Sequence, residues 1–170
     1  MTPDELKALQ APLKAHYKED PAAAKLVLKA SGVLDPPALV CRVATFAGPA
    51  AAGLHPAAGG PEGSACSGDM VLEALAACAG VTLCAVATAM NIPIRGGSVA
   101  AEGDLDFRGT LGVSKEVPIG FSEIRLRFDL DSDATPEQIA SLQKLTERYC
   151  VVAQSLKTPP QVTVNAHRKR

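Results

Sequence analysis

Thiols are the groups of this chain best suited to chemistry at neutral pH, and the sequence has five of them: Cys41, Cys66, Cys78, Cys84 and Cys150. No two are spaced as C-x-x-C, and no histidine lies near any of them in the sequence. Structural zinc sites need such close spacing, so we expect no metal. Core packing or thiolate nucleophilic chemistry are the roles that remain.

The position of each cysteine in the sequence indicates a role for some of them but not for all. Cys41 and Cys84 fall in apolar segments, where a cysteine packs as a small hydrophobic residue. Cys66 stands just before Ser67 and Gly68, at the start of a predicted helix, where the helix dipole lowers the pKa of a thiol. Composition alone leaves Cys78 and Cys150 open to either role.

Two long helices are predicted to hold Cys78 and Cys150. The first is rich in Ala and Leu and runs from Asp69 to about Asn91, where Pro93 closes it. The second begins at Thr135, with Gln138 at the capping-box position, and continues through Cys150 until Pro159 and Pro160 end it. Its apolar stripe is predicted to consist of Leu142, Leu145, Tyr149, Val152 and Leu156.

Strands are predicted where apolar and polar residues alternate, at residues 39–46, 97–108, 121–130 and 161–164. Residues 48–68 are rich in Gly, Pro and Ala and predict a long irregular loop. Strands with one polar face, covered on the other face by two long helices, make a two-layer α+β fold with an antiparallel sheet.

The N-terminal part is predicted to be helical. Thr2 and Glu5 form a capping box for a helix to about Tyr17, and Asp20 and Pro21 would start a second helix through Ala30. We therefore divide the chain into a helical extension at residues 1–37, a domain at 38–166 and a basic tail at 167–170.

Composition excludes several functional classes. The net charge is −1, and no basic face is interleaved with stacking aromatics, so nucleic-acid binding is not expected. The most apolar stretch, residues 70–90, contains Glu73 and indicates a buried core helix better than a membrane span. The polar N-terminus does not resemble a secretory leader, and five cysteines without one predict a reducing, cytoplasmic location.

Two segments resemble the OsmC/Ohr family. Residues 67–83, SGDMVLEALAACAGVTL, resemble its central-helix signature, a Gly-rich loop followed by a helix with an LxAxxAC core whose cysteine matches Cys78. Residues 145–152, LTERYCVV, resemble the family's second cysteine helix, which places Cys150 at the second cysteine. The resemblance extends over residues 39–164.

This resemblance implies an OsmC-like fold and a hydroperoxide reductase without a cofactor. Cys78 would be the peroxidatic thiol, which organic hydroperoxides oxidise to a sulfenic acid, and Cys150 the resolving thiol that forms a disulfide with it. A dithiol or other thiol donor would then reduce the disulfide. The resemblance also implies an intertwined homodimer with its sites at the subunit interface.

The sequence departs from the family's pattern ahead of the central helix. Family members place Pro-Glu where this chain has Ser67 and Gly68, and pair that Glu with an early-strand Arg that activates the thiol. Here Arg42 is the only early-strand arginine, and Glu73 is an acid that could pair with it. His55, in the long loop, could line the mouth of the site and shuttle a proton.

Three alternatives stay open from the sequence. Cys66 competes with Cys78 as the first thiol to react. The protein could be an OsmC-like stress or small-ligand-binding protein with little or no peroxidase activity. Another thiol-based activity, such as sulfur or acyl transfer, is the third.

Overall fold

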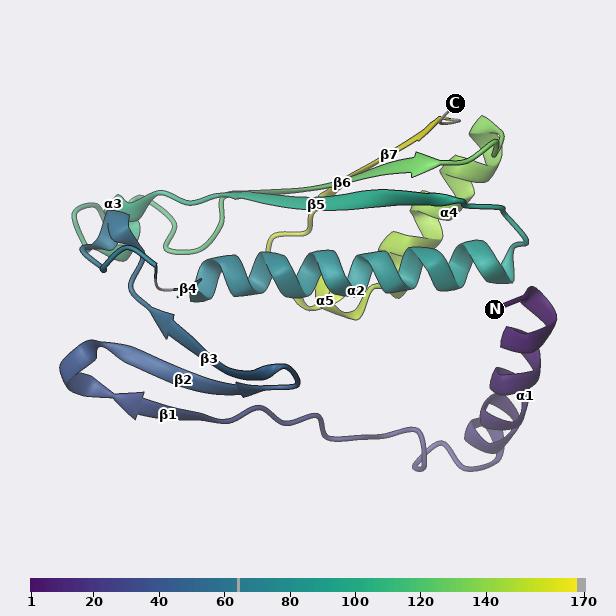
Figure 1. The fold of residues 1–170 in the computed structure, drawn as a ribbon, viewed down its shortest axis with the longest axis horizontal. Helices are drawn as coiled ribbons and strands as arrows, with labels where there is room; N and C mark the ends of the chain where they lie inside the picture. Colours follow the sequence, from purple (N-terminus) through teal and green to yellow (C-terminus); the bar gives the residue numbers. More distant parts are fainter. Residues whose placement is uncertain (64, 168–170) are drawn as a thin grey trace.

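A computed structural model describes residues 1–63 and 65–167 of the chain. The predicted basic tail therefore lies outside the described residues, except for His167, which ends the last strand. Figure 1 shows a sheet lying over one long helix, a second sheet on the other side of that helix, and an N-terminal helix near the end of the long helix. The predicted α+β fold class is confirmed.

The main sheet contains three strands, β5 (Gly96–Asp104), β6 (Glu123–Asp131) and β7 (Gln161–His167), in the order β5-β6-β7. β5 pairs with β6 antiparallel, as predicted, whereas β6 and β7 are parallel. Alternate residues of β6 point into the core, as its sequence period of two predicts: Ile124, Leu126, Phe128 and Leu130.

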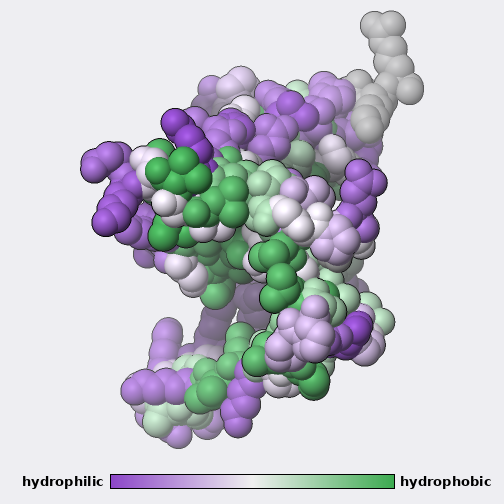
Figure 2. All heavy atoms as spheres, turned by 90° about the vertical axis from the view of Figure 1, so that its left-hand side faces the viewer, coloured by the Kyte–Doolittle hydropathy of each residue, from purple (hydrophilic) through white to green (hydrophobic). Residues whose placement is uncertain are grey.

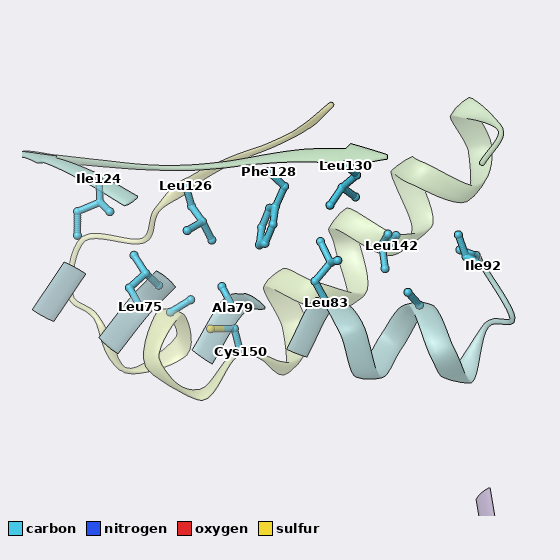
Figure 3. Close-up of a cluster of buried hydrophobic side chains, with 12 residues drawn as sticks. Leu75, Ala79, Leu83, Ile92, Ile124, Leu126, Phe128, Leu130, Leu142 and Cys150 are labelled. Carbon is cyan, nitrogen blue, oxygen red and sulfur yellow. The ribbon is translucent and has the colours of Figure 1, made fainter. Parts of the chain in front are cut away.

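The long helix α2 (Ser67–Ala89) packs against this sheet and confirms the predicted central helix. Its buried residues recur every four positions, so they form one stripe facing β6: Leu75, Ala79, Leu83 and Ala87 (Figure 3). By length and composition alone α2 could also cross a membrane. In this structure one face of α2 is buried in the core, and Val81, which lies on a different face of the helix, is 72% exposed.

The second predicted long helix is in fact two helices. α4 (Pro136–Tyr149) begins with the predicted capping box of Thr135 and Gln138. It ends at Cys150, whose backbone is extended, and α5 (Val151–Ser155) follows directly. Tyr149 is 56% exposed, so its predicted place in the apolar stripe is wrong.

The predicted loop at residues 48–68 is wrong in its first and last parts. β2 (Val40–Thr45) forms where a strand is predicted, but β3 (Gly48–Gly53) pairs with it antiparallel, and β4 (Ala65–Cys66) pairs with β3 parallel. Backbone pairing with the neighbouring strand overrides the weak strand propensity of Gly, Pro and Ala.

The predicted second N-terminal helix is also wrong. α1 (Pro3–Glu19) has the expected capping box, but after a turn at residues 21–24 the chain has no regular secondary structure until β1 (Gly32–Asp35), which pairs with β2. Lys25 to Lys29, with three large apolar residues, has no buried helix face to stabilise it. A short helix, α3 (Phe107–Thr110), follows β5.

Candidate active site

The structure brings Cys78 and Cys150 together across the contact between α2 and the α4–α5 break. Cys150 is 1% exposed and belongs to the buried core (Figure 3), and Cys78 is half-buried and packs against that core. Both cysteines are free thiols here, and the Cys150 thiol is a hydrogen-bond partner of Cys78. Two residues 72 positions apart in the sequence thus lie close enough for each thiol to shift the pKa of the other.

The surroundings of Cys78 favour its thiolate. Burial, the largest influence, raises the pKa of Cys78, but four hydrogen-bond donors oppose it: the backbone N–H of Val152, the Cys150 thiol, the backbone N–H of Val151 and the Thr82 hydroxyl. Together they hold the pKa of Cys78 below that of an ordinary thiol. A lowered thiol pKa is the property that a nucleophilic cysteine needs at neutral pH.

Cys150 is affected in the opposite direction. Burial raises its pKa most, and the hydrogen bond to Cys78 and the charge of the Cys78 thiolate raise it further, against the backbone N–H groups of Ala153 and Val152. The net effect is a pKa above that of an ordinary thiol. Two neighbouring thiols whose pKa values move apart can take different roles, with Cys78 as the nucleophile and Cys150 as the proton donor.

The break after α4 contributes to the lowered pKa of Cys78. The first N–H groups of a helix have no partner within the helix, and the extended backbone at Cys150 turns those of Val151 and Val152 toward Cys78. A continuous helix would use both groups in its own hydrogen bonds. The irregularity that the sequence analysis did not predict is therefore what supplies the donors.

Arg42 and Glu73 do not form the predicted pair. Arg42 lies on β2, opposite Val33 of β1, and its guanidinium forms an ion pair with Asp35 at 3.3 Å. Asp35 is two residues from Val33 on the same strand and therefore on the same face of the sheet. Glu73 is exposed on α2. No charged side chain is among the groups that shift the pKa of Cys78, so Arg42 does not activate it within this chain.

His55 and Cys66 have local partners instead. The Nδ1 atom of His55 accepts a hydrogen bond from the backbone N–H of Ala57 at 3.0 Å, and its ring stacks on Phe107 at 4.8 Å between centroids. Cys66 is the N-cap of α2, as its position predicts, and its sulfur accepts a hydrogen bond from the N–H of Gly68 at 3.4 Å. Neither is among the groups that act on Cys78.

The sequence analysis missed Thr82, Val151 and Val152. One signal was available for Thr82, because a residue four positions after a helical cysteine lies on the same face of the helix. The valines act through their backbone, which residue type does not reveal. Within the described residues, no group of three or more His, Cys, Asp and Glu side chains gathers to bind a metal ion.

Comparison with known proteins agrees with this geometry. The family described as OsmC-like protein matches residues 60–165, which include both cysteines of the pair. No match to a curated protein is found.

Solved structures share the fold at low sequence identity. An OsmC-like protein from Mycoplasma pneumoniae is 16% identical, with 86% of this chain and 99% of that one covered and a TM-score of 0.66. An OsmC-like protein of unknown function from Vibrio cholerae is 14% identical, covering 83% and 100%, with a TM-score of 0.68. An organic hydroperoxide resistance protein from Elizabethkingia anophelis is 15% identical, covering 85% and 98%, with a TM-score of 0.64. Because the family match extends over more than half of the sequence and carries the paired thiols, this chain belongs to the OsmC-like protein family.

Proposed function

We propose that this protein reduces organic hydroperoxides, with Cys78 as the peroxidatic thiol and Cys150 as the resolving thiol. The observation that carries the proposal is the proximity of two free thiols on packed helices, each of which shifts the pKa of the other, with the pKa of Cys78 lowered and that of Cys150 raised. Some proteins of the same fold are named organic hydroperoxide resistance proteins, which supports this substrate class. Leu72, Cys78 and Val152 are all partly buried against the same apolar core, and such surroundings suit an organic peroxide better than hydrogen peroxide.

The chemistry proceeds in three steps. The Cys78 thiolate attacks one peroxide oxygen, so that an S–O bond forms and the O–O bond breaks. The second oxygen leaves as an alkoxide and takes a proton to become an alcohol, and Cys78, oxidised by two electrons, becomes a sulfenic acid. Cys150 then loses its proton and attacks the Cys78 sulfur, which forms the disulfide and releases water. A dithiol donor returns two electrons and two protons, and both thiols are regenerated.

One equivalent of peroxide distinguishes the order of the thiols. Reduced protein is mixed with one equivalent of cumene hydroperoxide and a dimedone-type probe that traps sulfenic acid, and the labelled peptides are mapped. We expect label to accumulate on Cys78 in Cys150→Ser, whereas the unaltered protein gives a Cys78–Cys150 disulfide and little label. Label on Cys66 alone would overturn the proposal and move the reactive thiol to the cap of α2.

A small-ligand-binding role is the second candidate, and a separate cavity favours it. Its volume is about 620 Å³, and it lies between the start of α1, the C-terminal half of α2 and the start of β5. Apolar residues form much of its wall, among them Leu83, Ile92 and Val99. Cavities of this size and character suit small apolar ligands. The turnover measurement described in the Discussion separates this role from catalysis.

We also propose that the protein works as a homodimer. None of the residues in β1 to β4 is buried, and large apolar side chains are exposed on or beside these strands, such as Leu34, Leu39 and Phe46. Figure 2 shows hydrophobic residues both on the helix–sheet body and on the smaller lobe below it. A four-stranded sheet without a covered face is not stable alone, and a second copy of the chain would cover it together with the exposed side of α2.

Sedimentation tests the dimer with a matched pair of substitutions. Val81 on α2 and Val113 in the loop after α3 are both 72% exposed. We expect the unaltered protein and Val113→Glu to sediment as dimers at micromolar concentration, and Val81→Glu as a monomer, because a charge is costly in an apolar interface. A stable monomer of the unaltered protein, or a dimer of Val81→Glu, would contradict this arrangement.

A further inference from the structure

We propose that the cavity between α1, α2 and β5 is a binding site for a neutral, largely apolar small molecule, and that the first turn of α1 covers it. This inference rests on the small-ligand-binding candidate described above and gives it a ligand class, and it does not depend on catalysis by Cys78. The family match extends over residues 60–165, so the site combines a helix of the family with a segment that lies outside the match.

The floor of the cavity belongs to the rigid core. Leu83 and Ala87 of α2 and Phe128 and Leu130 of β6 line it, and each is at most 4% exposed. Protein cores rarely leave spaces much larger than a water molecule, so a hollow of about 620 Å³ beside these side chains is too large to be a packing defect. An apolar cavity of roughly 150 Å³ holds one benzene molecule, so this volume suits a ligand of roughly two or three rings.

The side chains of the walls offer no free charge. Among the described residues that line the cavity, Arg95 has the only charged side chain, and its guanidinium donates to Asp131 at 2.9 and 2.6 Å and to Asp133 at 2.6 Å. The Thr88 hydroxyl is also in use, because it donates to the carbonyl oxygen of Cys84 at 2.8 Å. A charged ligand would lose its hydration without gaining a partner, so these walls favour a neutral molecule.

The first turn of α1 closes one side of the cavity. Met1 and Pro3 line it. The capping box holds this turn together, since the Thr2 N–H donates to the Glu5 carboxylate at 2.7 Å and the Glu5 N–H to the Thr2 hydroxyl at 3.2 Å. The pKa of Glu5 is lowered chiefly by the hydrogen bond from the Thr2 backbone and further by the charge of the Met1 amino group, so this amine also has a partner within the chain.

α1 can move without disturbing the core. No residue of α1 is buried, and none belongs to the core cluster. Residues 25–31 have no regular secondary structure, and Figure 1 shows α1 at the C-terminal end of α2, joined to β1 by this long connection. A helix held by so little buried surface opens at a small free-energy cost, so it can admit a ligand and close over it.

The test uses N-phenyl-1-naphthylamine, a neutral three-ring probe whose fluorescence rises in apolar surroundings, titrated into the reduced full chain. We expect saturable binding of one probe per chain. The analogue 8-anilino-1-naphthalenesulfonate has the same rings with a negative charge and should bind about tenfold more weakly, because the walls offer it no free cation. Equal affinities for the two probes would overturn the assigned ligand class.

A matched pair of substitutions locates the probe. Thr88→Phe adds a ring at a residue that lines the cavity and should weaken binding of the neutral probe about tenfold, because it fills part of the volume. Ala89→Phe adds the same ring at the next residue of α2, which is exposed and outside the cavity lining, and should leave the affinity unchanged. Equal affinities in the two variants would overturn the site.

A third variant tests the cover. Leu6→Pro removes the N–H that donates to the Thr2 carbonyl oxygen at 3.0 Å and unwinds the first turn of α1. The dissociation rate of the probe, measured by stopped flow, should rise several-fold. An unchanged rate would overturn the role of α1.

Two further outcomes would contradict the inference. The first is the absence of probe binding by the unaltered protein, which is the result expected if a second copy of the chain fills the cavity. The second is protection of Cys78 from iodoacetamide by the bound probe, measured by peptide-resolved mass spectrometry, which would place the probe at the thiol pair. Because no peroxide is present, a failure of the proposed peroxidase function leaves these measurements valid, and the converse also holds.

Discussion

Replacing Cys78 with serine is expected to abolish the reduction of cumene hydroperoxide by a dithiol donor, a loss of about a thousandfold or more. A serine hydroxyl is almost fully protonated at neutral pH, so it cannot replace a thiolate whose formation the surrounding donors favour. The consumption of peroxide at steady state is the measurement. The matched control is Cys84→Ser, which makes the same change at an exposed position of the same helix and should keep full turnover.

The pH dependence of this turnover follows from the direction of the pKa shift. The thiolate is the form present above the pKa of Cys78, and that pKa is lowered. The rate should therefore rise with pH and reach half its maximum at a lower pH than the alkylation of a small free thiol measured in the same buffer. A midpoint at or above that of the free thiol would indicate an unactivated Cys78.

Two outcomes would contradict a catalytic role for Cys78. The first is turnover that survives in Cys78→Ser. The second is the absence of turnover in the unaltered protein together with retention of an apolar compound, which would favour the small-ligand-binding role. Sulfur or acyl transfer would give neither peroxide consumption nor a retained ligand, and would require a screen of other substrates.

The second large effect is expected from Leu142→Ala, which should lower the free energy of unfolding by about 2–5 kcal/mol. Leu142 is fully buried on α4, in the core cluster that also contains Leu83 and Cys150. Its truncation removes apolar contacts and leaves a cavity where α4 packs against α2. Urea denaturation at a fixed protein concentration, followed by circular dichroism, measures the change.

Leu111→Ala is the matched control for this measurement, because Leu111 is 55% exposed after α3. Its effect should stay within about 0.5 kcal/mol. The folded fraction of Leu142→Ala should also form the Cys78–Cys150 disulfide more slowly, since Leu142 supports the segment that carries Cys150. Equal stability losses in the two variants would show that α4 does not pack into the core in this way.

Much of the fold could be predicted from local sequence. The alternation of apolar and polar residues predicts β6, and the capping box at Thr135 predicts the start of α4. Both patterns are local, because they depend only on residues close together in the sequence. The family resemblance identified Cys78 and Cys150 as a pair. No periodicity in the sequence would have selected these two from the five cysteines.

The elements that the sequence analysis mistook are those decided by neighbours. Gly48–Gly53 has few strand-forming side chains and becomes β3 only because β2 offers its backbone groups for pairing. Residues 25–29 were predicted to be helical but form no helix. Their apolar side chains have no core to pack against, and a short helix is not stable without such packing.

The α+β class and the long central helix could be predicted from the sequence alone, because hydrophobic period and helix caps depend on residue type, and the family motif nominated Cys78 and Cys150 as the reactive pair that we propose. The surroundings that lower the pKa of Cys78 exist only in the tertiary structure. The extended backbone at Cys150 turns two N–H groups toward a sulfur on another helix, and Arg42 is bound to Asp35 instead. Backbone donors carry no residue-type signal, and a thiol pKa is set by the burial and hydrogen bonds that form only when α2 and the α4–α5 break meet.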